Sequence, residues 1–317
     1  METITPDQIQ KPWRSKRYPA LDVFLESYLL SRLAHPELHR FEAVFSHSLY
    51  FPSSRRIRRA HFFHATFQGL AKGCRECLDW KEYFVLAGVG GFFERISGSG
   101  CQNYAVSRQV QEECSLFHGF RNTGILYNAL DTRHFRPHPD RAGNTSGFRG
   151  LVVGRLDKGK GSGLVRSLGS LLPESFKLTL AGRATIPVAW SGDRLALLGV
   201  VPYSHLPELY AGADYVLCPS RYEGFGMTAI EAWACAKPII STNTGIVAEL
   251  VETESSLRQL VVDDPDDTAA FAEKIQLLRE NPGIGKRQAE WGLELVRQRF
   301  SISNMKSAYA EILETLL

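Results

Sequence analysis

The stretch from Pro219 to Glu249, PSRYEGFGMTAIEAWACAKPIISTNTGIVAE, indicates how the second half of the chain folds. It follows an apolar segment, Tyr215–Cys218, which predicts a buried strand, and it begins with a glycine-containing turn. The pattern of Met227–Ala236 predicts a helix, and Ile239–Thr242 predicts a second strand after Pro238. A strand, a glycine turn, a helix and a strand in this order are typical of parallel α/β folds.

The turn before this helix has the features of an anion-binding site. Gly224 and Gly226 allow the backbone to turn tightly and to approach a ligand. The first amides of a helix have no intrahelical partner, and the helix dipole favours a negative group beside them. The amides concerned are those of Gly226, Met227 and Thr228. We therefore expect a phosphate or another anion at this position.

Two carboxylates, Glu223 in the turn and Glu231 inside the helix, flank the expected anion site. They would repel a phosphate unless they bind other groups, and carboxylates accept hydrogen bonds from hydroxyls. A nucleotide-sugar carries hydroxyl groups on both sides of its diphosphate, so it matches this arrangement. The simpler alternative is a glycine turn with two solvated glutamates.

The E-x7-E spacing of Glu223 and Glu231, inside SRYEGFGMTAIEA, resembles the donor-site motif of the retaining glycosyltransferases of family 4. Proteins of that family have the GT-B fold, in which two Rossmann-like domains face each other. The resemblance implies that Glu223 binds hydroxyls of the transferred sugar and that Glu231 binds the ribose hydroxyls. It also implies donor contacts by the residues that lie between them, Gly224, Phe225, Gly226, Met227 and Thr228.

A second motif follows the predicted strand Leu151–Val153. Arg155 and Lys160 lie five positions apart in GRLDKGKG, so both cationic side chains can reach one point. A guanidinium and an ammonium there would suit a diphosphate. The string resembles the G-R-x-x-x-x-K-G pattern of family 4, in which the arginine and the lysine hold the donor diphosphate. The alternative is a solvated basic loop, and Lys158 is expected to be solvated in either case.

The reaction that the resemblance implies is sugar transfer from a nucleoside-diphosphate donor to a hydroxyl acceptor, with retention of the anomeric configuration. It implies no metal ion and no other cofactor. Cationic side chains and helix amides at the leaving diphosphate would stabilise the transition state. The expected partners are the nucleotide-sugar and an acceptor that is a saccharide, a lipid-linked molecule or a small molecule; nucleic acid is not expected.

A histidine in the first half of the chain is the third candidate. His64 follows the predicted strand Ala60–Phe63, and the carboxyl ends of strands are where α/β proteins place their sites. In relatives of family 4, a histidine after a strand of the first domain faces the donor sugar. His64 is therefore expected to be catalytic together with Glu223. His47 and His61 compete for this role, and a core or capping histidine is the alternative.

Composition and charge limit the class of protein. The 317 residues are 44% hydrophobic and 22% charged, which indicates a globular chain with room for two domains. A net charge of +3 gives no general case for nucleic-acid binding. The longest apolar run, Tyr83–Phe93, is shorter than the roughly 20 residues of a membrane-spanning helix. The N-terminus lacks a signal-peptide core and the six cysteines are scattered, so we expect a cytoplasmic protein, with basic residues available for contact with the inner membrane face.

The order of the predicted elements indicates an α/β protein of two halves, joined by a linker rich in Pro, Asp, Asn and Gly at His134–Gly147. We expect a GT-B-like architecture: an incomplete Rossmann-like acceptor domain at 1–147, a donor domain at 148–300, and a helix at 301–317 that crosses back. Further strands are predicted at 41–46, 60–63, 103–107, 125–127, 178–181, 195–198 and 257–262. Further helices are predicted at 21–33, 92–97, 108–117, 204–210 and 286–317, with one more after a cap at 266–268.

Family 4 proteins open with a strand, a glycine-rich loop and further units that have no counterpart before Phe41–Ser46. We therefore expect a shortened first domain. This leaves an alternative from another class of protein: a non-catalytic or truncated relic that binds a nucleotide-sugar or a partner protein. A nucleotide-sugar epimerase of the GT-B fold ranks lower, because it lacks the combination of the two motifs.

Three other motifs have simpler explanations. Cys74 and Cys77 form a C-x-x-C pair, but the spacing to the later cysteines fits no defined zinc motif. Asp264 and Asp266 match the D-x-D metal motif of another glycosyltransferase fold, yet they precede a helix and are expected to form a turn and a cap. The basic cluster Arg55–Arg59 suits an anionic lipid or a phosphorylated acceptor, or else is a solvated loop.

Overall fold

The computed structural model describes residues 41–317 except 48, 51–56, 139–146, 186 and 191–192. The chain divides into two compact units, one of Met1–Tyr127 with Lys306–Leu317 and one of Asn128–Met305. The division falls before the predicted linker, at Tyr127, and the last helix joins the first unit from Lys306 onward. The helix expected at 21–33, the arm at 1–19, Arg55, Arg56 and most of the linker lie outside the described residues.

The first unit is built on a four-stranded parallel sheet with the order β1-β2-β3-β4. Its strands are β1 (Ala43–His47), β2 (Arg58–Phe63), β3 (Gln102–Ala105) and β4 (Gly124–Ile125). All four lie where the sequence predicts strands, although β3 ends early, because Ser107 caps the following helix by accepting a hydrogen bond from Val110 N.

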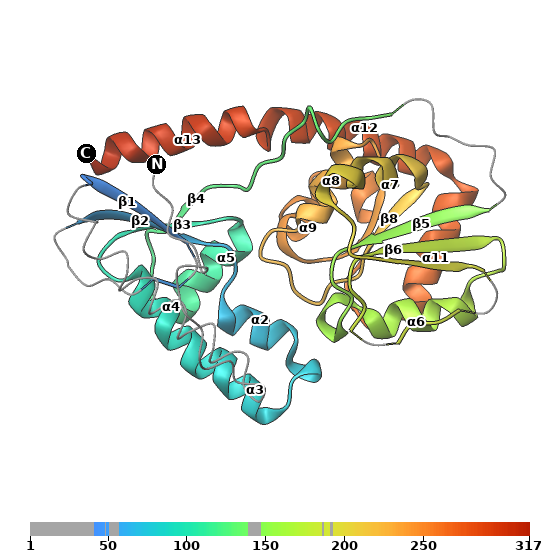
Figure 1. Ribbon diagram of the computed structural model, residues 1–317, viewed down its shortest axis with the longest axis horizontal. Helices are drawn as coiled ribbons and strands as arrows, with labels where there is room; N and C mark the ends of the chain where they lie inside the picture. Colours follow the sequence, from blue (N-terminus) through green and yellow to red (C-terminus); the bar gives the residue numbers. More distant parts are fainter. Residues whose placement is uncertain (1–40, 48, 51–56, 139–146, 186, 191–192) are drawn as a thin grey trace. The chain divides into compact units, whose positions relative to one another are not determined.

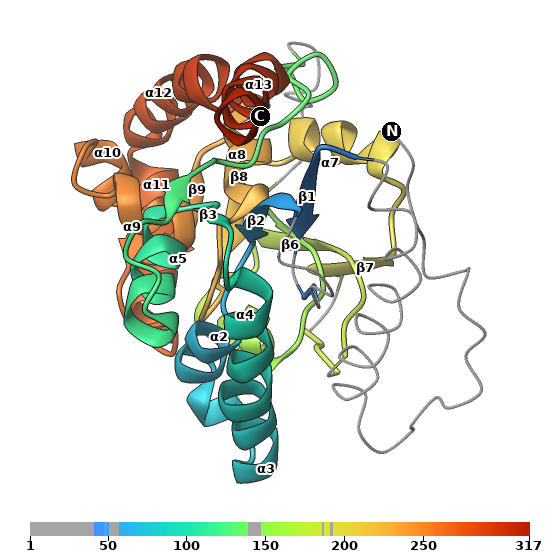
Figure 2. The same ribbon diagram turned by 90° about the vertical axis from the view of Figure 1, so that its left-hand side faces the viewer.

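Helices cover both faces of this sheet (Figures 1 and 2). The described helical segments are α2 (Phe67–Gly73), η2 (Arg75–Cys77), α3 (Trp80–Phe84), η3 (Val85–Gly90), α4 (Gly91–Gly98), α5 (Arg108–Glu113), η4 (Cys114–His118) and α13 (Ile302–Leu316). Two of them, η3 and η4, are π-helical and continue α3 and α5. α13 lies on one face of the sheet, and α2 to α5 lie on the other (Figure 1).

The C-terminal helix belongs to the core of the first unit. Ile312 and Leu316 of α13 pack with Ala60, Phe62 and Leu126. The burial of these apolar side chains stabilises the attachment of α13, at roughly 25 cal/mol per Å² of apolar surface removed from water. The last helix therefore completes the core of the unit whose sheet carries His64.

The second unit is built on a six-stranded parallel sheet with the order β10-β9-β8-β5-β6-β7. Its strands are β5 (Phe148–Val153), β6 (Phe176–Ala181), β7 (Leu195–Gly199), β8 (Tyr215–Cys218), β9 (Ile239–Thr242) and β10 (Val261–Val262). The chain adds β6 and β7 on one side of β5 and then β8, β9 and β10 on the other. The strand order therefore reverses between β5 and β8, which is the place where open α/β sheets bind ligands.

Two layers of helices enclose this sheet (Figure 1). The helices are η6 (Lys158–Lys160), α6 (Ser162–Leu171), η7 (Tyr203–His205), α7 (Leu206–Gly212), α8 (Met227–Ala234), α9 (Gly245–Leu250), α10 (Ser255–Arg258), α11 (Thr268–Glu280) and α12 (Pro282–Arg299). α6 packs against α11, and α8 packs against α12 on the other side. The main core lies between the sheet and the layer of α6 and α11, where Leu168, Leu180, Leu217, Phe271 and Ile275 are buried.

The stretch from Pro219 to Glu249, with the strand before it, folds as predicted. β8 and β9 have the predicted bounds, and α8 begins at Met227. α8 ends at Ala234, two residues earlier than expected, because Cys235 caps it and Ala236 turns into the left-handed region with φ of 53°. The predicted strand–turn–helix–strand unit is therefore confirmed.

The strand predicted at Leu257–Val262 is wrong over most of its length. Residues Ser255–Arg258 form α10, and only Val261 and Val262 form a strand. The Glu254 side chain caps α10 by accepting a hydrogen bond from Ser256 N. A short apolar run is compatible with a buried helix as well as with a strand, and here the cap favours the helix.

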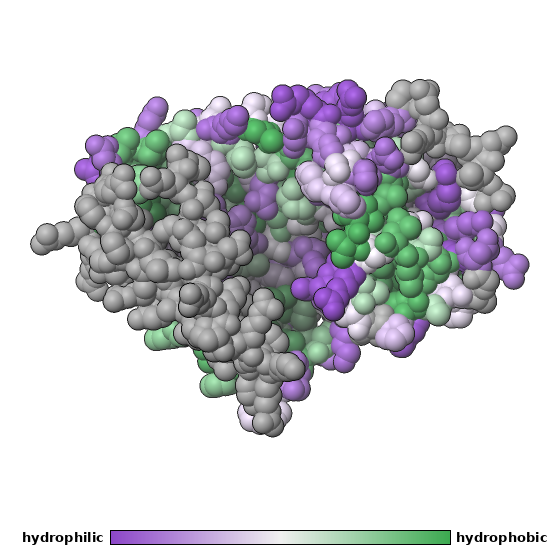
Figure 3. All heavy atoms as spheres, in the orientation of Figure 1, coloured by the Kyte–Doolittle hydropathy of each residue, from purple (hydrophilic) through white to green (hydrophobic). Residues whose placement is uncertain are grey.

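β7 is an edge strand with an exposed apolar surface. Leu197 and Leu198 are about half exposed, and Val200 just after the strand is 81% exposed. Figure 3 shows an apolar area over the part of the second unit that contains this edge of the sheet. The strand at 195–198 was predicted correctly, but its side chains contribute little to the core.

Candidate functional site

The loops that follow β5 and β8 meet at the carboxyl edge of the second sheet. The amide of Arg221 donates a 2.9 Å hydrogen bond to the carbonyl of Gly159, which joins the two loops. Gly161 has φ of 80°, and a Cβ atom there would lie only 2.5 Å from the carbonyl oxygen of Pro219. Any larger residue would push the loops apart. The predicted motifs at 154–161 and 219–226 therefore belong to one site.

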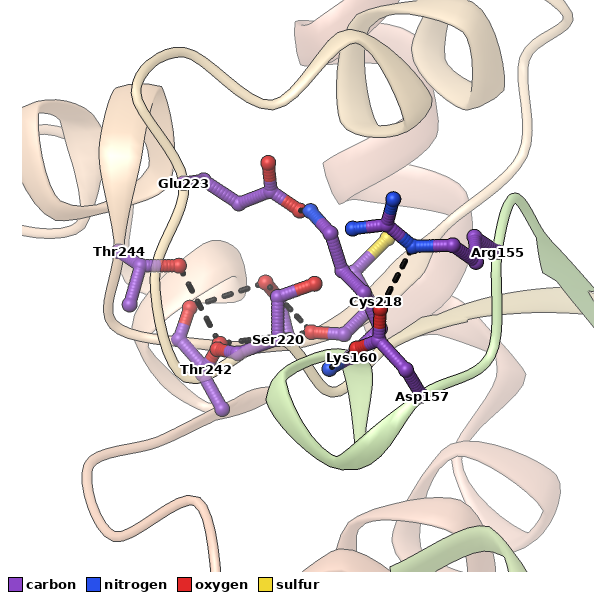
Figure 4. A network of polar contacts seen from close by, with 9 residues as sticks. Arg155, Asp157, Lys160, Cys218, Ser220, Glu223, Thr242 and Thr244 are labelled. Carbon is purple, nitrogen blue, oxygen red and sulfur yellow. Dashed lines mark hydrogen bonds and ion pairs between the residues drawn. The ribbon is translucent and has the colours of Figure 1, made fainter. Parts of the chain in front are cut away.

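Asp157 organises the basic loop. Its Oδ1 accepts a 3.0 Å hydrogen bond from the backbone amide of Lys160, and its Oδ2 accepts a 2.6 Å hydrogen bond from Nε of Arg155. The Arg155 side chain is 68% exposed, so its outer nitrogens stay accessible. Figure 4 shows the guanidinium of Arg155 and the ammonium of Lys160 pointing to the same place. Their predicted convergence is thus seen in the structure.

Lys160 and Glu223 form an ion pair across the two loops. Nζ of Lys160 lies 2.5 Å from Oε1 of Glu223, and both side chains are about one-third exposed. The sequence suggests different ligands for them, the diphosphate for the lysine and the sugar hydroxyls for the glutamate. In the structure the two side chains bind each other (Figure 4).

The turn before α8 presents a helix N-terminus to the same place. Gly226 is its N-cap, with φ of 101°, and no side chain caps the helix there. Met227 and Thr228 are partly exposed. Of the two glycines in the turn, Gly226 has a positive φ and Gly224 does not. The start of α8 can therefore receive an anion through its amides.

Phe225 has a structural side chain. Its ring is buried and packs edge-on against Phe300, with centroids 5.6 Å apart. Its carbonyl accepts a 2.7 Å hydrogen bond from Ile246 N. The ring of Phe225 therefore supports the turn from within the core.

Glu231 lies one turn into α8 and is only 7% exposed. Its Oε2 accepts a 2.6 Å hydrogen bond from the hydroxyl of Tyr210, which is fully buried in α7. Burial raises the pKa of the Glu231 carboxyl, and the hydrogen bond from Tyr210 partly counteracts this rise. Tyr210 therefore fixes one oxygen of Glu231.

Hydroxyl side chains hold the backbone on which the turn with Glu223 rests (Figure 4). Oγ1 of Thr242, at the end of β9, donates a 2.5 Å hydrogen bond to the carbonyl of Ser220 and lies 3.3 Å from Oγ1 of Thr244. Thr242 and Ser220 are buried. These contacts join the ends of β8 and β9, so the turn that carries Glu223 has a fixed base.

His64 in the first unit lies at the carboxyl end of β2, as predicted. Its Nε2 is 2.9 Å from Nδ1 of His47, the last residue of β1, and the two rings are stacked. Burial lowers the pKa of both imidazoles, and that of His47 falls to about 4, with the neighbouring His64 as the second cause. His61 is instead a core residue, fully buried, with Nδ1 2.8 Å from Oγ of Ser46.

Two carboxylates anchor the loop that carries His64. The amide of Phe67 donates to both oxygens of Glu94, at 3.0 and 2.9 Å. Thr66 caps α2 and donates a 2.6 Å hydrogen bond to Glu113. The loop is therefore held on two sides, which gives His64 a fixed base.

The remaining motifs have structural roles. Oδ1 of Asp264 accepts a hydrogen bond from Asp266 N at 2.9 Å, and Asp267 caps α11, as expected of a turn and a cap. Cys74 ends α2 and Cys77 lies in η2, and none of the six cysteines forms a disulfide. Among the described residues no group of three or more His, Cys, Asp or Glu side chains could hold a metal ion. Arg59 of the basic cluster is buried and donates to the carbonyls of Ser97 and Ser99.

A search of the described helices finds none that is both long and apolar enough to cross a membrane.

Sequence reasoning missed two residues of these sites, Asp157 and Tyr210. Asp157 was recognisable, because an aspartate three residues before the amide that it caps is a common turn signal. Tyr210 gave no such signal, since its contact joins positions 21 residues apart along the chain. His47 was named only as a competitor of His64, and its contact with His64, 17 residues away, could not be predicted.

Comparison with known proteins agrees with this geometry. Residues 148–293 match the family described as "Glycosyl transferases group 1". The chain is 30% identical over 220 residues to the lipopolysaccharide core biosynthesis mannosyltransferase LpsB of Rhizobium meliloti, covering 62% of this chain and 61% of that protein. It is 26% identical over 210 residues to an alpha-maltose-1-phosphate synthase of Mycobacterium tuberculosis, covering 56% and 52%. The chain thus spans less than two thirds of the length of these relatives.

Solved structures of low sequence identity share the fold. Sucrose-phosphate synthase from Thermosynechococcus elongatus superposes with a TM-score of 0.75 at 20% identity, covering 98% of this chain and 82% of that one. Anabaena HepE in complex with UDP-glucose gives a TM-score of 0.72 at 18% identity, covering 90% and 82%. The chain has an α/β, GT-B-like glycosyltransferase fold with parallel sheets. The family match lies within the second unit, at residues 148–293, and the solved structures share the fold of the chain.

Proposed function

We propose that the protein transfers a sugar from a nucleoside-diphosphate donor to a hydroxyl group of an acceptor. The observation that carries the proposal is the convergence of Arg155, Lys160 and Glu223 beside the start of α8, at the strand-order reversal of the second sheet. Two cations and a helix N-terminus suit a diphosphate, and the carboxylates suit the hydroxyls on its two sides.

Each group has a distinct part in the proposed reaction. Arg155, Lys160 and the amides of Met227 and Thr228 bind the diphosphate and stabilise the negative charge that develops on it as the sugar leaves. Glu223 orients the sugar through its hydroxyls. Glu231, held by Tyr210, binds the ribose.

Retention of configuration and independence from a metal ion are part of the proposal. They rest on the E-x7-E motif of Glu223 and Glu231 and on the G-R-x4-K-G motif of Arg155 and Lys160. His64 is the proposed group of the first unit that binds a sugar hydroxyl, because it lies exposed just after the carboxyl end of β2, and His47, exposed at the end of β1, is its competitor.

A transfer assay tests the proposal. The structural neighbour solved with UDP-glucose makes this donor the first probe, followed by GDP-mannose and ADP-glucose. The assay follows release of the nucleoside diphosphate with and without EDTA, and proton NMR of the product identifies its anomer. We expect turnover that persists in EDTA and yields the anomer of the donor. Saturable donor binding without transfer to any acceptor or to water would favour the non-catalytic alternative.

A further inference from the structure

The ion pair of Lys160 and Glu223 joins groups that the proposed function assigns to two parts of the donor. Nζ and Oε1 are 2.5 Å apart, so the ammonium and the carboxylate form a charge-assisted hydrogen bond. A diphosphate that binds Lys160 competes with Glu223 for the ammonium group. The pair therefore couples the diphosphate position to the sugar position.

The backbone leaves this pair little freedom to separate. Gly161 is pressed against Pro219, and Arg221 N is bonded to the carbonyl of Gly159. The amide of Lys160 is capped by Asp157, and Glu223 stands only a few residues after Pro219. Because both loops are fixed, donor binding must reorient the side chains and not the loops.

The local charges balance before a ligand arrives. The two carboxylates of Asp157 and Glu223 offset the two cations Arg155 and Lys160, since each carboxylate is bonded to one of them. A nucleotide-sugar brings about two negative charges, and a free nucleoside diphosphate brings about three, because its terminal phosphate has a second pKa near 6. In the donor complex the sugar hydroxyls give Glu223 new hydrogen bonds. After transfer those hydroxyls are gone, and Glu223 faces the more negative product.

We infer that Glu223 selects the nucleotide-sugar over the free nucleoside diphosphate and so promotes product release. This inference rests on the proposed function. The carboxylate of Glu223 repels the bare diphosphate and recaptures Lys160, whereas sugar hydroxyls stabilise it in the donor complex. Glu223 thus binds the sugar and also determines whether the site prefers the nucleotide-sugar or the free nucleoside diphosphate.

Calorimetric titration tests this inference. UDP, GDP and ADP, and UDP-glucose, GDP-mannose and ADP-glucose, are titrated into the wild type, Glu223→Gln, Glu223→Asp and the control Glu280→Gln. Glu280 is an exposed carboxylate at the end of α11, so its change alters net charge equally. For the base that binds the wild type, we expect Glu223→Gln to bind the free diphosphate about tenfold more tightly and the sugar form no more tightly. Glu223→Asp, which keeps the charge, and Glu280→Gln should stay within about twofold of the wild type for the free diphosphate.

The outcomes separate this inference from the proposed function. If the wild type binds none of the nucleotide-sugars, the proposed function fails and this inference fails with it. If the wild type binds one, but Glu223→Gln does not bind the free diphosphate more tightly, only the inference is wrong. The inference is also wrong if Glu223→Asp binds the free diphosphate as tightly as Glu223→Gln, because the gain in affinity then does not depend on the negative charge. Thermal unfolding of each variant confirms that the compared proteins are folded.

Discussion

The hydroxyl of Tyr210 donates a 2.6 Å hydrogen bond to Oε2 of Glu231, and both side chains are buried in the second unit. The bond stabilises a carboxylate that burial disfavours, and it fixes the orientation of the group that we assign to the ribose. The position of Glu231 thus depends on α7 as well as on its own helix.

Tyr210→Phe should therefore destabilise the protein by about 1.5–3 kcal/mol, the typical contribution of a hydrogen bond to a charged group. Donor affinity should fall as well, and more at pH 6 than at pH 8, because loss of the bond raises the pKa of Glu231 further and so favours its neutral form at the lower pH. Urea unfolding and donor titration at both pH values measure this. Tyr215→Phe, an equally buried tyrosine on β8, is the control and should leave donor affinity unchanged. Equal effects of the two variants on affinity would contradict the role of Tyr210.

Asp157→Ala should weaken donor binding about tenfold or more, although Asp157 carries the wrong charge to bind a phosphate. Its two hydrogen bonds hold the Lys160 amide and the Arg155 guanidinium, and both would lose their orientation. The matched control is Asp267→Ala, which removes the cap of α11 and should cost about 1 kcal/mol of stability without affecting the donor. If Asp157→Ala binds the donor as well as the wild type, Asp157 does not organise the loop.

The contact of His47 with His64 predicts a loss of stability in acid. The pKa of His47 falls from 6.5 to about 4 in the folded protein, so the folded state binds fewer protons than the unfolded chain between these values. The stabilisation is complete above about pH 6.5 and is lost as the pH falls toward 4. Because solvent screens this exposed pair, we expect the free energy of unfolding to fall by about 1 kcal/mol over this pH range.

Chemical denaturation at pH 7.5, 5.5 and 4.5 checks this dependence. His47→Gln should lose less stability than the wild type over this range. His205→Gln, at an exposed histidine of the second unit, should follow the wild type. A His47→Gln protein that is as acid-sensitive as the wild type would show that the pair does not titrate in this way.

His64→Ala should reduce turnover more than donor affinity, because the proposed partner of His64 is a hydroxyl of the sugar that moves in the reaction. Glu223→Gln should reduce turnover in the same way. Lys160→Ala should reduce both quantities, since the diphosphate is present in the ground state and in the transition state. Steady-state kinetics combined with donor titration separate these cases. If His64→Ala turns over as fast as the wild type, the role assigned to His64 is wrong. The roles assigned to residues of the second unit would not be affected.

The local architecture of the donor site could be predicted from the sequence, but its side-chain partners could not. β8, β9 and the start of α8 follow from apolar runs, a glycine turn and a proline stop, which act over a few residues. The pairing of Lys160 with Glu223 joins residues 63 positions apart, and it depends on the close packing of Gly161 on Pro219. The strand predicted at 257–262 failed for a local reason, because the cap at Glu254 outweighed an ambiguous apolar run.

The most direct test of the account is calorimetric titration of UDP-glucose, GDP-mannose and ADP-glucose, without added metal, into the wild type, Lys160→Ala and Lys286→Ala. Lys286 is an exposed lysine on α12 and controls for the loss of one positive charge. We predict saturable binding of at least one donor by the wild type and by Lys286→Ala, and a loss of at least tenfold in affinity for Lys160→Ala. Binding of none of the donors by the wild type, or equal affinities of the two lysine variants, would contradict the account.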